Sequence, residues 1–198
     1  ASDVYKRQLL NIGKISMLMK KNDSLLLVID VQERLAPAMD NPREVINGCA
    51  ALLGVARELD VPCIITEQYP QGLGHTMVDL RNEAGEKTLY LPKLEFSCLR
   101  NDDVFAAVKK SGKTQIVIAG VETHICIIQT AFELKEAGYE VFVVSNACSS
   151  RKQIQHVLGL QRLMHGGIEV VTIEMVIFEW LEKAGSQQFK DITRKYVI

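Results

Sequence analysis

The chain has 198 residues, of which 47% are apolar, and a net charge of −1, as is typical of one soluble globular domain with its own hydrophobic core. The balanced charge disfavours nucleic acid or an anionic membrane as partner, and no apolar run reaches the ~18 residues of a transmembrane span. Five cysteines without CxxC spacing argue against a disulfide framework and for a reducing compartment, so we expect a cytoplasmic protein.

Residues 1–20 carry no clear pattern. We expect them to be an N-terminal extension or an expression remnant, with Met17 as a natural start, and we expect the domain to occupy residues 21–198. The basic residues of the first stretch make a mitochondrial location the alternative, which Asp3 disfavours.

Six apolar runs predict strands that are buried on both faces. In chain order they are Leu25–Asp30, Val61–Thr66, Thr88–Leu91, Gln115–Ala119, Tyr139–Val144 and Ile168–Ile173.

Helical patterns separate these runs. Asn41 and Pro42, followed by Glu44, are typical of an N-cap, a proline in the first turn and a capping box. Further helices are expected after a cap at Asn101, from about Cys126 to Gly138, over residues 151–165 and in the C-terminal tail. In that tail the apolar stretch around 176–180 is a weak signal for a partner surface and thus for a homo-oligomer.

The alternation of strands and helices predicts a three-layer doubly wound α/β fold, with a six-stranded parallel sheet of order 3-2-1-4-5-6 and helices on both faces. Such sheets bind ligands at the carboxyl ends of their strands, where the strand order reverses. Here that point lies between the first and the fourth strand.

Three residues with useful chemistry follow strands. Taken alone, each has an ordinary structural explanation. Asp30 after the first strand could equally be a helix cap or a loop carboxylate. A lone Lys93 after the third strand is typical of solvated surface, and a lone Cys126 after the fourth is typical of a small buried residue. Strands 1 and 3 lie roughly 10 Å apart in this order, a gap that a lysine side chain largely spans. We therefore expect all three side chains to meet in one pocket, with the helix start lowering the pKa of Cys126.

The other cysteines are weaker candidates for a nucleophile. Cys49 and Cys63 fall in apolar patterns and are expected to be buried thiols. Cys98 and Cys148 are expected in loops, and Cys148, which follows the fifth strand, is the better substitute. No Ser-His-Asp or Cys-His pairing competes with the three residues above.

The motifs Leu27-Val-Ile-Asp30-Val-Gln32, Leu91-Pro-Lys93 and Gly120-Val-Glu-Thr-His-Ile-Cys126 resemble those of the isochorismatase-like cysteine hydrolases. The resemblance runs from about Leu25 to the C-terminus. Within the family the chain is most similar to the isochorismatase-domain-containing branch, through Thr66-Glu-Gln-Tyr-Pro70 and Asn146-Ala-Cys-Ser-Ser150.

The resemblance implies that Asp30, Lys93 and Cys126 form a catalytic triad. It also implies a cis peptide bond between Val121 and Glu122, and an oxyanion hole made by the backbone N–H groups of Glu122 and Cys126. Nicotinamidases of this superfamily hold a metal through an Asp-x-His cluster after the second strand, which this chain lacks. We therefore expect no metal and no cofactor.

These observations favour a cysteine-dependent hydrolase of a small amide-type substrate with a non-peptide C–N bond. Gln32, Gln68 and Tyr69 are the candidate walls of its substrate pocket. The alternative is a binding or scaffold protein that keeps the pocket but has lost turnover. A nuclease is a third hypothesis, against which the balanced charge and the absence of an aromatic-basic stripe argue.

Overall fold

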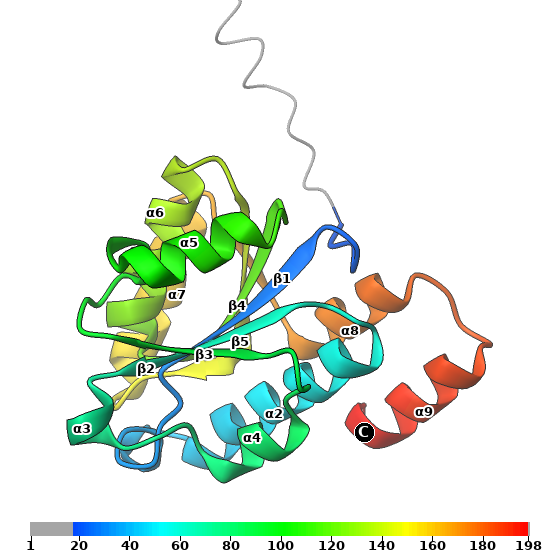
Figure 1. Ribbon diagram of the computed structural model, residues 1–198, viewed down its shortest axis with the longest axis horizontal. Coiled ribbons are helices and arrows are strands. Elements are labelled where there is room, and N and C mark those ends of the chain that lie inside the picture. Colours follow the sequence, from blue (N-terminus) through cyan, green and yellow to red (C-terminus); the bar gives the residue numbers. More distant parts are fainter. Residues whose placement is uncertain (1–17, 198) are drawn as a thin grey trace, which may run out of the picture.

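The computed structural model describes residues 18–197 (Figure 1). Within that range one six-stranded sheet has the order β3-β2-β1-β4-β5-β6, and every neighbouring pair is parallel, which confirms the predicted fold. The strands are β1 (Ser24–Ile29), β2 (Cys63–Gln68), β3 (Leu89–Lys93), β4 (Gln115–Val121), β5 (Glu140–Ser149) and β6 (Glu169–Val171). The proposed start at Met17 lies outside the described residues.

Helices cover both faces of the sheet (Figure 1). One layer contains α2 (Pro42–Glu58), α4 (Val78–Glu83), α8 (Ile173–Leu181) and α9 (Gln187–Tyr196). The other contains α5 (Asp102–Lys110), α6 (Ile128–Glu136) and α7 (Gln153–His165), and the short α3 (Pro70–Leu73) follows β2. None of the helices between residues 18 and 197 has the length and hydrophobicity needed to cross a bilayer.

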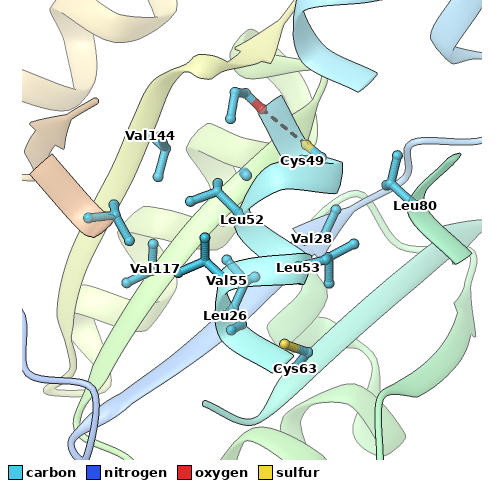
Figure 2. Close-up of a cluster of buried hydrophobic side chains, with 14 of the residues drawn as sticks. Leu26, Val28, Cys49, Leu52, Leu53, Val55, Cys63, Leu80, Val117 and Val144 are labelled. Carbon is cyan, nitrogen blue, oxygen red and sulfur yellow. Dashed lines mark hydrogen bonds between the residues drawn. The ribbon is translucent and has the colours of Figure 1, made fainter. Parts of the chain in front are cut away.

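Each face of the sheet has its own hydrophobic core. Because side chains alternate along a strand, Leu26 and Val28 of β1 face α2, while Leu27 and Ile29 face the α5–α6 layer. Figure 2 shows Leu52, Leu53 and Val55 of α2 stacked over Leu26 and Val117. The central strands β1 and β4 are therefore packed on both faces.

Two cysteines that were predicted to be buried belong to the core between α2 and the sheet. Cys49 and Cys63 are buried, as expected (Figure 2). The Cys49 thiol donates to the carbonyl of Ala147 at 3.4 Å, which links α2 to the end of β5.

The two predicted helix starts lie at the expected residues, but only one of them has the expected capping hydrogen bond. Asn41 is the N-cap of α2 and Pro42 lies in its first turn, yet the Asn41 side chain makes no capping hydrogen bond, so the expected capping box does not form. Asn101 does cap α5, because its Oδ1 accepts from the N–H of Val104 at 3.2 Å. Gly138 follows α6 with φ 94°, as a helix-terminating glycine should.

Most of the C-terminal apolar segment that was expected to contact a partner is buried within the chain itself, and Phe178 is the member that stays exposed, at 43%. Val176, Ile177 and Trp180 of α8 are fully buried in the chain's own core, and Trp180 Nε1 donates to Ser24 Oγ at 3.0 Å. Met19, within the stretch expected to precede the domain, is buried in the same core. An amphipathic helix needs an apolar face to pack, and here the sheet provides the opposing surface.

Gly120 lies where β4 passes closest to β1. Its φ is 117°, and an added Cβ would stand 2.1 Å from the carbonyl oxygen of Ile29, next to Asp30. We expect Gly120→Ala to unfold the domain or to lower its melting temperature far more than Gly112→Ala. Gly112 also has a positive φ, 65°, but an added Cβ there meets nothing within 4 Å. That control carries only the backbone strain of about 1–2 kcal/mol, and equal thermal shifts for the two variants would contradict the close approach.

Candidate active site

The structure brings Asp30, Lys93 and Cys126 together at the carboxyl edge of the sheet. Lys93 Nζ lies 2.6 Å from Asp30 Oδ2 and 3.9 Å from Cys126 Sγ. Asp30 follows β1, Lys93 ends β3 and Cys126 lies in a π-helical turn after β4. The lysine side chain therefore reaches past the intervening strand β2, as the strand order predicts.

The carboxylate of Asp30 is oriented by two donors. Lys93 Nζ binds one oxygen, and the hydroxyl of Thr66 on β2 donates to the other at 2.7 Å. Asp30 has φ 58°, a left-handed conformation that aspartate tolerates better than most residues. This bend ends β1 and holds the fully buried acid at the strand tip.

Lys93 is an ammonium ion held on several sides. Besides Asp30, its Nζ donates to Gln68 Oε1 at 2.6 Å and to the carbonyl of Glu95 at 3.1 Å. Burial lowers the pKa of Lys93, but the charge and hydrogen bond of Asp30, together with the nearby thiols of Cys126 and Cys98, outweigh burial, so the pKa lies above its ordinary value. The pair is thus a fixed, charged unit beneath the thiol.

Cys126 is a neutral thiol at rest, which corrects the expectation of a lowered pKa. Burial first, and the adjacent Asp30 carboxylate second, raise the pKa of Cys126 well above its ordinary value, and Lys93 offsets them only in part. Cys126 is 6% exposed, whereas Asp30 is completely buried. A substrate would therefore meet the sulfur before the acid.

The turn that carries Cys126 spans Thr123–Ile127 and leads into α6. The peptide bond between Val121 and Glu122 is cis. The carbonyl of Glu122 accepts from the N–H groups of Ile125 and Ile127, at 3.0 and 3.3 Å. Glu122 and Cys126, whose N–H groups are the candidate oxyanion donors, thus bracket one tight turn.

Of the candidate pocket residues, Gln68 touches the three-residue cluster directly through Lys93. Gln32 is completely buried, and its amide binds backbone groups: it donates to the carbonyls of Gln68 and Gly74 and accepts from the N–H of Gln68. Tyr69 is 52% exposed, and its N–H donates to the carbonyl of Lys93. Gln32 thus supports the end of β2 that carries Gln68, while the exposed Tyr69 ring is available to contact a ligand.

Glu67 lies near the carboxyl end of β2, in the region that was expected to lack a metal-binding cluster. Its Oε1 accepts from the N–H and the hydroxyl of Thr76, at 2.7 and 2.8 Å, and Oε2 lies 3.3 Å from His75 Nδ1. Burial raises the pKa of Glu67, but these hydrogen bonds outweigh it and leave the pKa below its ordinary value. Between residues 18 and 197 no three His, Cys, Asp or Glu side chains gather to hold a metal.

The two alternative nucleophiles, Cys98 and Cys148, were expected in loops, and the structure places both in regular elements. Cys98 opens a short 3-10 turn and Cys148 belongs to β5. Burial raises the pKa of Cys98 to about 11 and that of Cys148 to about 12. Among the described residues, the ammonium of Lys93 lies within hydrogen-bond reach of the Cys126 sulfur and not of Cys98 or Cys148, so Cys126 stays the better candidate.

Comparison with known proteins shows the family of this chain. The isochorismatase domain profile matches residues 24–175, and isochorismatase domain-containing protein 2 of Danio rerio is 35% identical over 184 residues, covering 92% of this chain and 89% of the relative. The chain belongs to the isochorismatase family. Isochorismatase family protein 1A of Dictyostelium discoideum is similar too, with 32% identity over 92% of this chain and 88% of its own length.

Solved structures give the same isochorismatase-like fold. One described as the MAR1 ribonuclease of Caenorhabditis elegans superposes with a TM-score of 0.84 at 31% identity, over 90% of this chain and 91% of that one. YcaC of Pseudomonas aeruginosa, described with hexane-2,5-diol and covalent acrylamide, superposes with a TM-score of 0.86 at 25% identity. The match covers 93% of this chain and 94% of that one. YcaC of Escherichia coli, described as an octameric hydrolase of unknown specificity, has 0.87 at 25% identity over 93% of each chain.

Sequence reasoning missed residues that support this isochorismatase-family site. Thr66 ends an apolar run as its one hydroxyl, two positions before Gln68, so both side chains point to the same face of β2. The position of Thr66, a polar residue at the tip of a buried strand, could have predicted its contact with Asp30 on the neighbouring strand. The segment Ser149–Arg151, which contacts the turn of Cys126, gave no comparable signal because its partners are far away in the sequence.

Proposed function

We propose that this isochorismatase-family protein hydrolyses a non-peptide C–N bond in a small amide-type molecule, through a thioester on Cys126. The observation that carries the proposal is the buried Asp30–Lys93 ion pair, whose ammonium lies 3.9 Å from the Cys126 sulfur. A neutral thiol beside a carboxylate and a cation can lose its proton at the moment of attack.

In the acylation step Asp30 takes the thiol proton while the sulfur attacks the carbonyl carbon and the C=O electron pair moves onto oxygen. A carboxylate offers about four acceptor positions, and Thr66 and Lys93 occupy one on each oxygen, which leaves room for this proton. The N–H groups of Glu122 and Cys126 receive the oxyanion. When the C=O bond re-forms, the C–N bond breaks and the nitrogen takes the proton from Asp30.

In the deacylation step water attacks the thioester and gives a proton to Asp30. Collapse of the second tetrahedral intermediate releases a carboxylic acid and the thiolate, which recovers its proton from Asp30. Lys93 stays positively charged throughout, because the raised pKa favours its ammonium form. Its charge stabilises the thiolate in both half-reactions.

One relative supports a reactive nucleophile in this fold. Acrylamide is an electrophile that alkylates thiolates, and YcaC of Pseudomonas aeruginosa is described with covalent acrylamide. The ribonuclease name of the Caenorhabditis elegans structure favours the alternative of RNA cleavage. The net charge of −1 disfavours it, because RNA binding draws on clustered positive charge.

Cys126→Ala is expected to lower hydrolysis of a panel of small amides, and of p-nitrophenyl acetate, by about 10³-fold or more. Mass spectrometry should find the acetyl group, and the acrylamide adduct, on Cys126 of the wild-type protein only. Cys148→Ala is the matched control, because Cys148 is equally buried, at 6% exposure, and lies at the same edge of the sheet. Wild-type turnover in the Cys126 variant would refute the mechanism, and a wild-type protein without turnover would favour the idle scaffold.

We also propose a homo-oligomer in the cytoplasm. The octameric state described for YcaC of Escherichia coli supports the assembly. The five cysteines are free and buried, which suits a reducing compartment. A small molecule is the partner that this buried site fits best.

A further inference from the structure

The turn that carries the candidate nucleophile is bound, residue by residue, to the end of β5. Glu122 binds Arg151, the hydroxyl of Thr123 donates to the carbonyl of Ser149 at 3.0 Å, and His124 Nδ1 lies 3.0 Å from Ser150 Oγ. The reaction scheme above uses none of these side-chain contacts. They join the end of β4 to the segment Ser149–Arg151, which continues from its neighbouring strand.

The contact of Glu122 differs from the others because it carries charge. Its carboxylate is buried, with 7% of the side chain exposed, while the Arg151 side chain is 59% exposed. Arg151 donates through its backbone N–H at 2.9 Å and through Nε at 3.0 Å to both oxygens. Within the described part of the chain Arg151 is the one ion-pair partner of Glu122.

This carboxylate stands in an unfavourable place for the proposed chemistry. The backbone N–H of Glu122 is a proposed donor to the oxyanion, and the side chain of the same residue brings a negative charge within a few bonds of it. Like charges repel strongly where protein excludes water. A transition state that gathers negative charge there requires the carboxylate to be neutralised by a cation.

We propose that Arg151 is a positioning residue of this site, which neutralises Glu122 and holds its N–H toward the oxyanion. The inference rests on the proposed function. The guanidinium acts through Glu122 and touches no reacting atom. It should therefore matter for steps that form an oxyanion and be irrelevant to steps that do not.

The test compares two reactions of Cys126 in Arg151→Ala, Arg151→Lys and the double variant Arg151→Ala/Glu122→Gln. Acylation by p-nitrophenyl acetate passes through an oxyanion, whereas alkylation by iodoacetamide does not. The backbone N–H of Arg151 is present in every variant, so only the guanidinium is tested. Arg57→Ala is the control. Arg57 lies in the last turn of α2, away from the site, and pairs with Glu83 of α4.

We expect Arg151→Ala to slow acylation about 10- to 100-fold, in kcat rather than in KM, while alkylation stays within about twofold of wild type. Arg151→Lys should keep most of the rate, and Glu122→Gln should restore much of it in the Arg151→Ala background, because the uncompensated charge is gone. Unchanged acylation in Arg151→Ala would overturn the inference, and so would a parallel loss of alkylation or a double variant without rescue. Failure of the proposed function is a separate result: wild-type Cys126 would carry no acetyl group.

Discussion

Asp30→Asn is expected to accelerate alkylation of Cys126 at neutral pH while lowering turnover by about 10²- to 10⁴-fold. The Asp30 carboxylate raises the pKa of Cys126, and Lys93 lowers it. Removing the negative charge removes its contribution to the raised pKa of Cys126, so the pKa falls and a larger fraction is thiolate. Turnover falls all the same, because asparagine cannot accept and return the proton.

Iodoacetamide alkylation from pH 6 to pH 10, followed by mass spectrometry of Cys126, measures the first effect. The wild-type rate should still rise through pH 9, because burial and Asp30 hold the pKa well above its ordinary value. In the Asp30 variant the curve should move to lower pH. Asp40→Asn, an exposed aspartate before α2, is the control. Slower alkylation in Asp30→Asn would contradict the effect of Asp30 on the Cys126 pKa, and hydrolysis at the wild-type rate would exclude Asp30 as the base.

The second large effect concerns stability. The Asp30–Lys93 pair is completely buried in both side chains, so Lys93→Met leaves an uncompensated carboxylate in the core. Breaking one member of a buried pair costs about 3–5 kcal/mol, whereas replacing both by uncharged groups often costs little. We expect Lys93→Met to reduce the free energy of unfolding by that amount and Asp30→Asn/Lys93→Met to recover much of it.

Urea unfolding of the four members of this cycle gives the coupling energy. Arg194→Met provides the exposed counterpart, since Arg194 pairs with Asp191 at 81% side-chain exposure. That change should cost at most about 1 kcal/mol. A Lys93→Met variant as stable as Arg194→Met would show that the pair contributes no structural constraint, and the rigid geometry assumed for the site would be wrong.

Local sequence predicted the central strands because runs such as Leu25–Asp30 and Gln115–Ala119 are apolar throughout, as strands buried on both faces are. The third run was also expected to be buried, yet Leu89 and Tyr90 of β3 are 48% and 40% exposed. The strand order was assumed to be the common one for a doubly wound sheet, and the structure confirms it. Every strand of a parallel sheet ends at the same edge. The meeting of Asp30, Lys93 and Cys126 could therefore be anticipated from their places at strand ends.

Interactions between distant segments were not predictable in the same way. The hydroxyl of Thr66 on Asp30, the guanidinium of Arg151 on Glu122 and the burial of Trp180 against Ser24 each depend on side-chain directions and distances. A capping pattern at Asn41 was present in the sequence, yet its side chain makes no capping bond. Local propensity could not decide these contacts because their partners are brought close only by folding.

The protonation state of the Cys126 thiol is the property of the site that the sequence predicted least well. The sequence by itself determined the alternation of strands and helices, and thus the fold class and the edge of the sheet at which Asp30, Lys93 and Cys126 lie, because hydrophobic periodicity is a local property. Only the tertiary structure decided that the thiol is neutral. The pKa of the sulfur depends on the depth of its burial and on its closeness to the carboxylate of Asp30, and both exist only once the strands have come together.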